Sequence, residues 1–297
     1  MSYHPYKTFR TTVARITPLS PHFTRITFTG EDLTHFGTDG LDQRIKLIIP
    51  FADGTVTDVG QLDESLSMGE WYRAWRELPD DKRNPIRTYT IRAPRPEQHE
   101  IDIDFVLHGT DGPASAWATH AQIGDELQVV GPDARAEDVG GIEWKPGAAT
   151  QVLIAGDETA APAICSIVES LPEDAVGEVY VEVPTDADAL TLTAPAGVQV
   201  TWLGRGGAAH GVRVSAAVHA WGRARAAVAS ETALTDPDPE EVLWEVPDAV
   251  AGAEYAWLAG EAGTITALRR HLVRDLGIDR RSIAFMGYWR QGRAEGV

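Results

Sequence analysis

The chain of 297 residues contains a single cysteine, Cys165. One thiol can neither form an internal disulfide nor hold an iron–sulfur cluster or a cysteine-rich zinc site. Because Cys165 follows the small apolar run 160–164, we expect a buried structural thiol rather than a nucleophile. Any redox chemistry must therefore come from a bound cofactor.

The chain is also poor in positive charge and in long apolar runs. Its 26 lysines and arginines face 44 acidic residues, a net charge of −18, which argues against nucleic-acid binding because phosphate neutralisation needs clustered positive charge. No stretch approaches the roughly 20 apolar residues that span a bilayer, and residues 1–7 hold no apolar signal core. We therefore expect no nucleic-acid partner, no membrane insertion and a cytoplasmic protein. The motifs H-E-x-x-H and G-x-S-x-G are absent from the sequence too, so nothing in it supports metal-assisted or acyl-transfer hydrolysis.

The first half of the chain has the pattern of short antiparallel strands. In 101–107, large apolar residues at every second position alternate mostly with aspartate, which is the period of a half-buried strand. Glycine and proline separate several such segments, and this predicts a small β-barrel. The expected strands cover 9–16, 23–28, 44–49, 87–92, 101–107 and 126–131, with a helix over 113–120.

The second half alternates apolar strands with helices, which is typical of a doubly wound, largely parallel α/β sheet. The composition shifts to glycine and turn formers around 140–147, which makes 132–146 the expected linker. We therefore predict an α+β two-domain protein with a barrel over 1–138 and an α/β domain over 139–297. An acidic, proline-broken loop is expected over 235–241. The expected strands are 151–155, 178–183, 198–203, 255–259 and 282–288, and the helices are 160–170, 212–229 and 262–276.

One strand and one turn of the barrel half have the chemistry of a flavin cradle. The strand carries Arg87, Tyr89 and Thr90, so that one face can offer a guanidinium, an aromatic plane and a hydroxyl. The glycine turn 112–115 begins a helix, and the N–H groups of a helix N-terminus bind anions such as a pyrophosphate. An isolated R-x-Y-T is more often an ordinary strand, but the turn that follows favours a flavin site. The residues of the turn that we expect to contact the flavin cofactor are Gly112, Ala114 and Ser115.

Five segments in order along the chain resemble the siderophore-interacting proteins, which are FAD-dependent ferric-siderophore reductases of the ferredoxin-reductase superfamily. The segments are 87–92, 104–109, 112–118, 156–163 and 287–293. The resemblance implies FAD in the barrel domain and an NAD(P)H-binding-like α/β domain. It also implies that Arg87 pairs with the FAD pyrophosphate, that Tyr89 lies against the isoalloxazine, and that Thr90 bonds near the reactive ring nitrogen.

The same resemblance suggests further cofactor contacts, each with a structural alternative. His108 contacts the flavin or makes a structural hydrogen bond, and the pair Tyr288 and Trp289 lies near the flavin or packs in the core. The turn of Asp157, Glu158 and Thr159 departs from the glycine-rich turn of common NAD(P)H reductases, because its acidic side chains would repel a pyrophosphate. These three residues contact the FAD or cap the helix.

Basic residues indicate the substrate side. Residues 262–297 contain seven arginines against three acidic residues, and a local basic patch would steer a negatively charged ferric chelate. Lys46 resembles the family's barrel lysine, and we expect it to bind substrate together with Arg290. Arg205 follows an expected strand and is, by position, a candidate for the 2′-phosphate of NADPH.

The resulting hypothesis is that NAD(P)H, or reduced ferredoxin, reduces the FAD, which then reduces ferric iron in a siderophore and releases it as Fe(II). Hard oxygen donors suit Fe(III) better than Fe(II), so reduction loosens the chelate. Two alternatives stay open: a general NAD(P)H:flavin or ferredoxin-type reductase, and a siderophore-binding protein with a vestigial flavin site. The sequence does not specify the siderophore, the electron donor or the oligomeric state.

Overall fold

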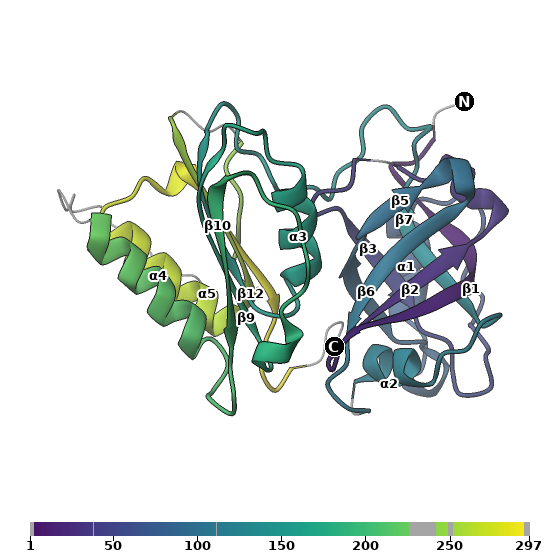
Figure 1. Ribbon diagram of the computed structural model, residues 1–297. Coiled ribbons are helices and arrows are strands. Elements are labelled where there is room, and N and C mark those ends of the chain that lie inside the picture. The colour runs from purple at the N-terminus through teal and green to yellow at the C-terminus, as the bar shows by residue number, and fades with distance from the viewer. Residues whose placement is uncertain (1–2, 38, 111, 226–241, 249–251, 294–297) are drawn as a thin grey trace. The chain divides into compact units, whose positions relative to one another are not determined.

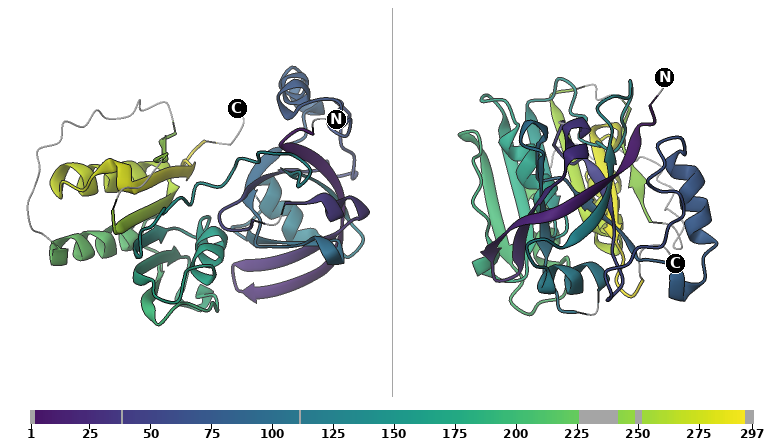
Figure 2. Two further views of the ribbon diagram at one scale, coloured as in Figure 1. Left: turned by 90° about the horizontal axis from the view of Figure 1, so that it is seen from above. Right: turned by 90° about the vertical axis from the view of Figure 1, so that its right-hand side faces the viewer.

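The computed structural model describes residues 3–37, 39–110, 112–225, 242–248 and 252–293. These residues form two compact units, 3–142 and 143–293, whose elements are labelled in Figure 1 and seen from two further sides in Figure 2. Each unit has its own sheet and its own hydrophobic core. The expected acidic loop 235–241 and the end of the helix expected over 212–229 lie outside the described residues.

The first unit is a curled antiparallel sheet, so the expected antiparallel barrel is confirmed. Among the described residues its strand order is β4-β3-β7-β1-β2-β6-β5, and the sheet curls on itself (Figure 2). Every paired neighbour runs antiparallel. The strands are β1 (Tyr6–Ser20), β2 (Phe23–Thr29), β3 (Arg44–Ile48), β4 (Ile86–Thr90), β5 (Ala93–Arg95), β6 (Glu100–Val106) and β7 (Glu126–Pro132).

Strand β6 lies between β2 and β5, and both of its faces are covered. One face buries apolar side chains such as Phe105, as the alternation predicted. On the other face, Asp102 and Asp104 are buried as well, because Arg95 and Arg25 each approach one of these carboxylates to 2.7 Å. The expectation of a half-buried strand is therefore wrong at this point, since arginines from neighbouring strands replace solvent over the acidic face.

The barrel unit also contains a helix that the pattern of short strands does not predict, α1 (Met68–Arg76). It begins with a capping box, in which the Ser67 N–H donates to the Glu70 carboxylate over 2.8 Å. Trp71 and Trp75 are buried and pack against β3, β4 and β7. The helix therefore covers the outer side of these three strands.

The second unit is a six-stranded sheet in the described residues, and its largely parallel character confirms the expected α/β domain. The strand order is β10-β9-β8-β12-β13-β11, parallel except at β11. The strands are β8 (Gln151–Gly156), β9 (Val176–Val183), β10 (Gly197–Gly204), β11 (Trp244–Glu245), β12 (Glu254–Glu261) and β13 (Ile283–Trp289).

Helices cover both faces of this sheet. Helix α3 (Ala161–Glu169) lies on one face, whereas α4 (Val212–Arg225) and α5 (Ala262–Arg269) lie on the other (Figure 1). Cys165 is buried within α3, as expected. The chain passes from β8 outward to β10 and then returns to add β12 beside β8. The boundary between β8 and β12 is therefore the topological switch point, where open α/β sheets bind ligands.

Short helical turns complete the described chain. A π-helical turn, Arg270–Asp275, continues α5, so that the helix expected over 262–276 is present in two parts. In the part of the chain that the structure describes, no helix combines the length and apolar character needed to cross a membrane. The remaining helices are α2 (Pro113–His120) and the 3-10 turns Glu31–His35, Asp80–Lys82, Pro96–Gln98, Asp186–Asp188 and Arg280–Ser282.

Candidate functional site

The candidate flavin strand, β4, pairs with one neighbour, β3, and lies at an edge of the barrel sheet. Successive strand residues point to opposite faces, so Arg87 and Tyr89 share a face and Thr90 lies on the other. The expectation that one face offers all three groups is therefore wrong for Thr90. The Tyr89 ring lies 4.8 Å from the ring of Phe105, centroid to centroid, and packs against the barrel core.

The turn before α2 is held by one buried hydroxyl. Ser115 is 1% exposed, and its Oγ accepts the backbone N–H of His108 over 3.0 Å and donates to the Gly109 carbonyl over 2.7 Å. A Cβ atom at Gly112 would lie 2.8 Å from the His108 imidazole, so this ring sits against the start of the helix. The structure thus brings His108, Gly112 and Ser115 together at the start of α2.

The N-terminus of α2 keeps donors available to a ligand. The N-cap residue, Gly112, has no side chain, and among the described residues no side-chain hydrogen bond caps the helix. The first-turn N–H groups of Ala114 and Ser115 have no acceptor within the helix. These amides, the guanidinium of Arg87 and the ring of Tyr89 are the donor and stacking groups that a flavin dinucleotide requires. The residues present therefore fit FAD.

Lys46 lies on β3, directly opposite Thr88 in the register. Its Nζ donates to the Thr88 hydroxyl over 3.0 Å, and the side chain is half-buried. By strand alternation, Lys46 shares a face with Thr88 and Thr90 rather than with Arg87 and Tyr89. The structure therefore fixes the lysine beside β4, on the face that carries the hydroxyls.

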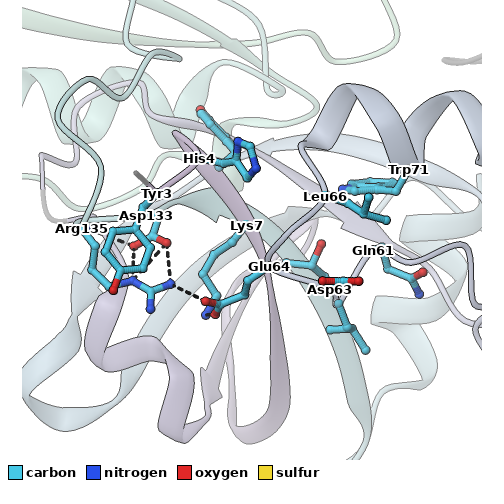
Figure 3. A pocket seen from close by; sticks show the side chains of 13 residues that line it. Tyr3, His4, Lys7, Gln61, Asp63, Glu64, Leu66, Trp71, Asp133 and Arg135 are labelled. Carbon is cyan, nitrogen blue, oxygen red and sulfur yellow. Dashed lines mark hydrogen bonds and ion pairs between the residues drawn. The ribbon is translucent and has the colours of Figure 1, made fainter. Parts of the chain in front are cut away.

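A separate pocket of the barrel unit, beside the start of β1, carries no residue predicted from the sequence. It is lined by charged side chains that neutralise one another (Figure 3). Lys7 lies 2.5 Å from Glu64, and Arg135 lies 3.1 Å from Glu64 and 2.7 Å from Asp133. This paired set presents little net charge to a ligand, and we assign it no function.

In the second unit, Asp157 joins the ends of three strands. Its Oδ1 accepts the N–H and the hydroxyl of Thr159 over 2.9 and 2.5 Å. Its Oδ2 accepts the N–H of Glu261 and the indole N–H of Trp289, both over 2.8 Å. Burial, together with the charge of Glu158, raises the pKa of Asp157 to about 6. The acidic turn is thus a buried junction that spans the switch point between β8 and β12.

Glu158 belongs to a second buried network. Arg205 is 8% exposed and pairs with both carboxylate oxygens of Glu158 over 2.8 and 2.7 Å. The same guanidinium lies 3.2 Å from Glu182, and His210 Nδ1 lies 3.7 Å from Glu158. The sequence reasoning missed Glu182 and His210. One signal was available for Glu182, because an acidic residue inside an apolar strand must find a partner when it is buried.

The two aromatic residues at the end of β13 point to opposite faces. The Trp289 ring meets His210 edge to face, with centroids 5.1 Å apart, on the side of the acidic turn. The Tyr288 ring stacks on Trp244 and meets the edge of Trp257, at 6.0 and 6.2 Å. Tyr288 therefore packs among aromatic rings of the sheet, whereas Trp289 belongs to the acidic junction. Arg290 follows directly and is half-buried.

Both units match models of one protein family. Residues 12–136 match the siderophore-interacting FAD-binding domain, and residues 149–292 match the siderophore-interacting protein. The chain belongs to the siderophore-interacting protein family. The fold and the resemblance predicted from the sequence are thereby confirmed.

Similar proteins cover nearly the whole chain. The ferric vibriobactin reductase ViuB of Vibrio cholerae is 30% identical over 279 residues, which are 93% of this chain and 87% of that protein. An uncharacterised protein of Mycobacterium tuberculosis is 34% identical over 298 residues, which are 99% of this chain and 94% of that protein.

Solved structures agree with this assignment. The siderophore-interacting protein SipS from Aeromonas hydrophila has a TM-score of 0.66 at 30% identity, and covers 97% of this chain and 94% of its own. A siderophore utilization protein from T. fusca has a TM-score of 0.71 at 27% identity, covering 99% and 96%. The ferredoxin reductase of a carbazole 1,9a-dioxygenase system, at 14% identity and a TM-score of 0.57, shares the two-domain fold, with 96% of this chain and 70% of its own covered.

Proposed function

We propose that this siderophore-interacting protein is a FAD-dependent oxidoreductase that reduces ferric iron held by a siderophore and releases it as Fe(II). Its electron source is NAD(P)H or reduced ferredoxin. The observation that carries the proposal is the presence, in one barrel unit, of the β4 strand with Arg87 and Tyr89 and of the α2 N-terminus without a side-chain cap, in a chain of this family that is 30% identical to a ferric vibriobactin reductase. The barrel is then the FAD-binding domain, and the α/β unit is the NAD(P)H-binding-like domain.

The barrel residues hold the cofactor in this proposal. The planar fork of Arg87 suits two phosphate oxygens, and the amides of Ala114 and Ser115 add donors at the positive end of a helix. Ser115 fixes the turn through its own hydroxyl, so these amides are preorganised. Tyr89 offers its ring to the isoalloxazine, while Thr90 and His108 offer polar groups. Bound FAD supplies the hydride acceptance and single-electron transfer that side chains cannot perform.

The substrate side of the proposal rests on Lys46 and Arg290. A ferric chelate with oxygen ligands often carries negative charge, which a lysine or arginine attracts. Lys46 is oriented by its hydrogen bond to Thr88, so its charge is held at a fixed place on the barrel. Reduction to Fe(II) weakens binding by hard oxygen donors, and the iron leaves without any acid or base from the protein.

The proposal is tested by steady-state turnover of the FAD-loaded protein. Ferric siderophores of the catecholate and hydroxamate classes are compared with protein acceptors such as oxidised ferredoxin, and Fe(II) is followed with a chromogenic chelator. We expect turnover with at least one ferric siderophore and a higher KM in the Lys46→Gln variant. Arg15→Gln is the matched control, because Arg15 is exposed on β1 and pairs with Glu100, outside the basic segment 262–297. Turnover with protein acceptors alone would contradict the proposal and favour a general reductase.

A second candidate is a siderophore-binding protein in which the flavin site is vestigial. It is favoured by the acidic junction, because Asp157 occupies the switch point at which a doubly wound sheet would bind a pyridine nucleotide. Purification of the protein without FAD, together with saturable siderophore binding and no flavin uptake on addition of FAD, would support this candidate. FAD bound at one equivalent would exclude it.

A further inference from the structure

The carboxyl ends of β8, β9 and β10 lie side by side, because these strands are parallel and adjacent. Each end contributes one charged side chain to a common cluster. Glu158 follows β8, Glu182 lies one residue before the end of β9, and Arg205 follows β10. In doubly wound sheets this edge receives the adenosine half of a dinucleotide, and an arginine here accommodates a 2′-phosphate.

Arg205 is already engaged with two carboxylates of its own chain. Both of its terminal nitrogens bond to Glu158, over 2.8 and 2.7 Å, and one also lies 3.2 Å from Glu182. These are the donors that a phosphate would need for a two-pronged contact. Because the guanidinium is 8% exposed, a phosphate would have to displace a buried carboxylate in order to reach it.

The backbone donors at the N-terminus of the neighbouring helix, α4, are also bound by a side chain of the protein itself. The Glu182 carboxylate accepts the backbone N–H groups of Gly211, Arg213 and Val214, over 2.8, 2.9 and 3.0 Å, at the start of α4. A helix N-terminus ordinarily offers these donors to a bound anion. Here a fully buried side chain takes them, so the helix provides no second place for a phosphate.

The charge balance of this edge disfavours an additional anion. The buried carboxylates of Glu158 and Glu182 share the guanidinium of Arg205, and the buried carboxylate of Asp157 adjoins Glu158. A 2′-phosphate adds about two negative charges near them, whereas a ribose 2′-hydroxyl can donate to a carboxylate.

We propose that Glu158 and Glu182 hold Arg205 as an internal counter-ion, so that this edge accepts an adenine dinucleotide with a free 2′-hydroxyl and discriminates against one that carries a 2′-phosphate. The three residues determine specificity and take no part in the chemistry. The inference rests on the proposed function, and within it on NAD(P)H as the electron donor.

The test is isothermal titration calorimetry of the FAD-loaded full chain with two unreactive probes, ADP-ribose and 2′-phospho-ADP-ribose. We expect ADP-ribose to bind at least about tenfold more tightly, the effect of like charges a few ångströms apart near a protein surface. Equal or tighter binding of the phosphorylated probe would overturn the inference. The wild-type comparison alone decides this, so the inference does not depend on a variant that folds.

Variants then identify the residues responsible. The Glu158→Gln substitution removes one negative charge and the ion pair between Glu158 and Arg205. The affinity for ADP-ribose divided by that for the phosphorylated probe should therefore fall by about tenfold. The double variant Glu158→Gln with Arg205→Gln keeps the net charge, and the preference should stay within about threefold of wild type. If Arg205 instead bound the phosphate, this double variant would lose affinity for the phosphorylated probe alone. Arg281→Gln, an exposed arginine before β13, is the control and should change neither affinity.

Failure of the inference and failure of the proposed function are separable. If neither probe binds but NADH or NADPH still reduces the flavin, the nucleotide binds elsewhere, so the inference is overturned and the proposed function stands. If neither probe binds and neither nucleotide reduces the flavin, NAD(P)H is not the electron donor, and the inference is overturned as well. Reduced ferredoxin would then be the remaining electron donor of the proposed function.

Discussion

Replacing Asp157 by Asn gives a pH-dependent change in stability that follows from the burial of this carboxyl. The side chain is 4% exposed and touches the ends of three strands. Burial and the neighbouring charge of Glu158 raise its pKa from 3.8 to about 6. The ionised form is therefore less favourable in the folded protein than in the unfolded chain, and asparagine removes this ionisation.

The sign and size of the effect follow from proton linkage. Between pH 3.8 and about 6 the folded state holds the Asp157 proton more tightly than the unfolded state, so the contribution to stability falls as the pH rises through this window. A shift of about two pKa units corresponds to about 3 kcal/mol. About 0.5 kcal/mol of this has accrued by pH 4, so the Asp157→Asn variant should gain about 2.5 kcal/mol relative to wild type in the free energy of unfolding between pH 4 and pH 7.

The assay is urea unfolding at pH values from 4 to 7, followed by tryptophan fluorescence and far-UV circular dichroism. The quantity of interest is the difference in the free energy of unfolding between variant and wild type at each pH. Asp279→Asn is the matched control, because hydrogen bonds from Arg281 lower the pKa of this exposed carboxyl, and its difference curve should be flat above pH 4. A flat curve for Asp157→Asn, or one of opposite slope, would refute the reasoning.

Three further substitutions test the two units. Ser115→Ala removes the hydroxyl that fixes the α2 turn, so FAD affinity in a fluorescence titration should fall severalfold and the free energy of unfolding by about 1–3 kcal/mol. Trp257→Ala empties a fully buried position, and we expect a loss of about 3–5 kcal/mol in denaturant unfolding. Gly260→Ala places a Cβ 2.6 Å from the Asp157 carboxylate at a φ of 149°, so a lower melting temperature and an altered Trp289 emission are expected.

The sequence predicted the features that depend on local pattern. Alternation in 101–107 and the apolar run 151–155 identified a barrel strand and a parallel strand, because periodicity reflects which face each strand buries. The strand around Arg87 and the helix that begins after Gly112 were predicted for the same reason, whereas their role as a flavin site stays a prediction. Helix α1 was missed although Ser67 and Glu70 form a capping box that the sequence contains.

The features that the sequence did not predict depend on pairing between distant segments. Arg205 meets Glu158 across 47 residues, and nothing in either segment specifies the partner. The burial of Asp102 likewise depends on Arg95 from the adjoining strand β5. Position alone suggested a phosphate ligand at Arg205, whereas the folded chain shows an arginine bound to its own carboxylates.

The most direct test of the central claim is an anaerobic redox titration of the FAD-loaded protein, followed by flavin absorbance. NADH, NADPH and reduced ferredoxin are added in turn, and a ferric siderophore is then mixed in without oxygen. We expect the yellow colour to bleach with at least one of these donors. Ferric siderophore should then restore the colour while Fe(II) appears at two equivalents per flavin, since a two-electron carrier reduces two one-electron acceptors. Recovery of the colour only after oxygen is admitted would show that ferric siderophore is not the electron acceptor.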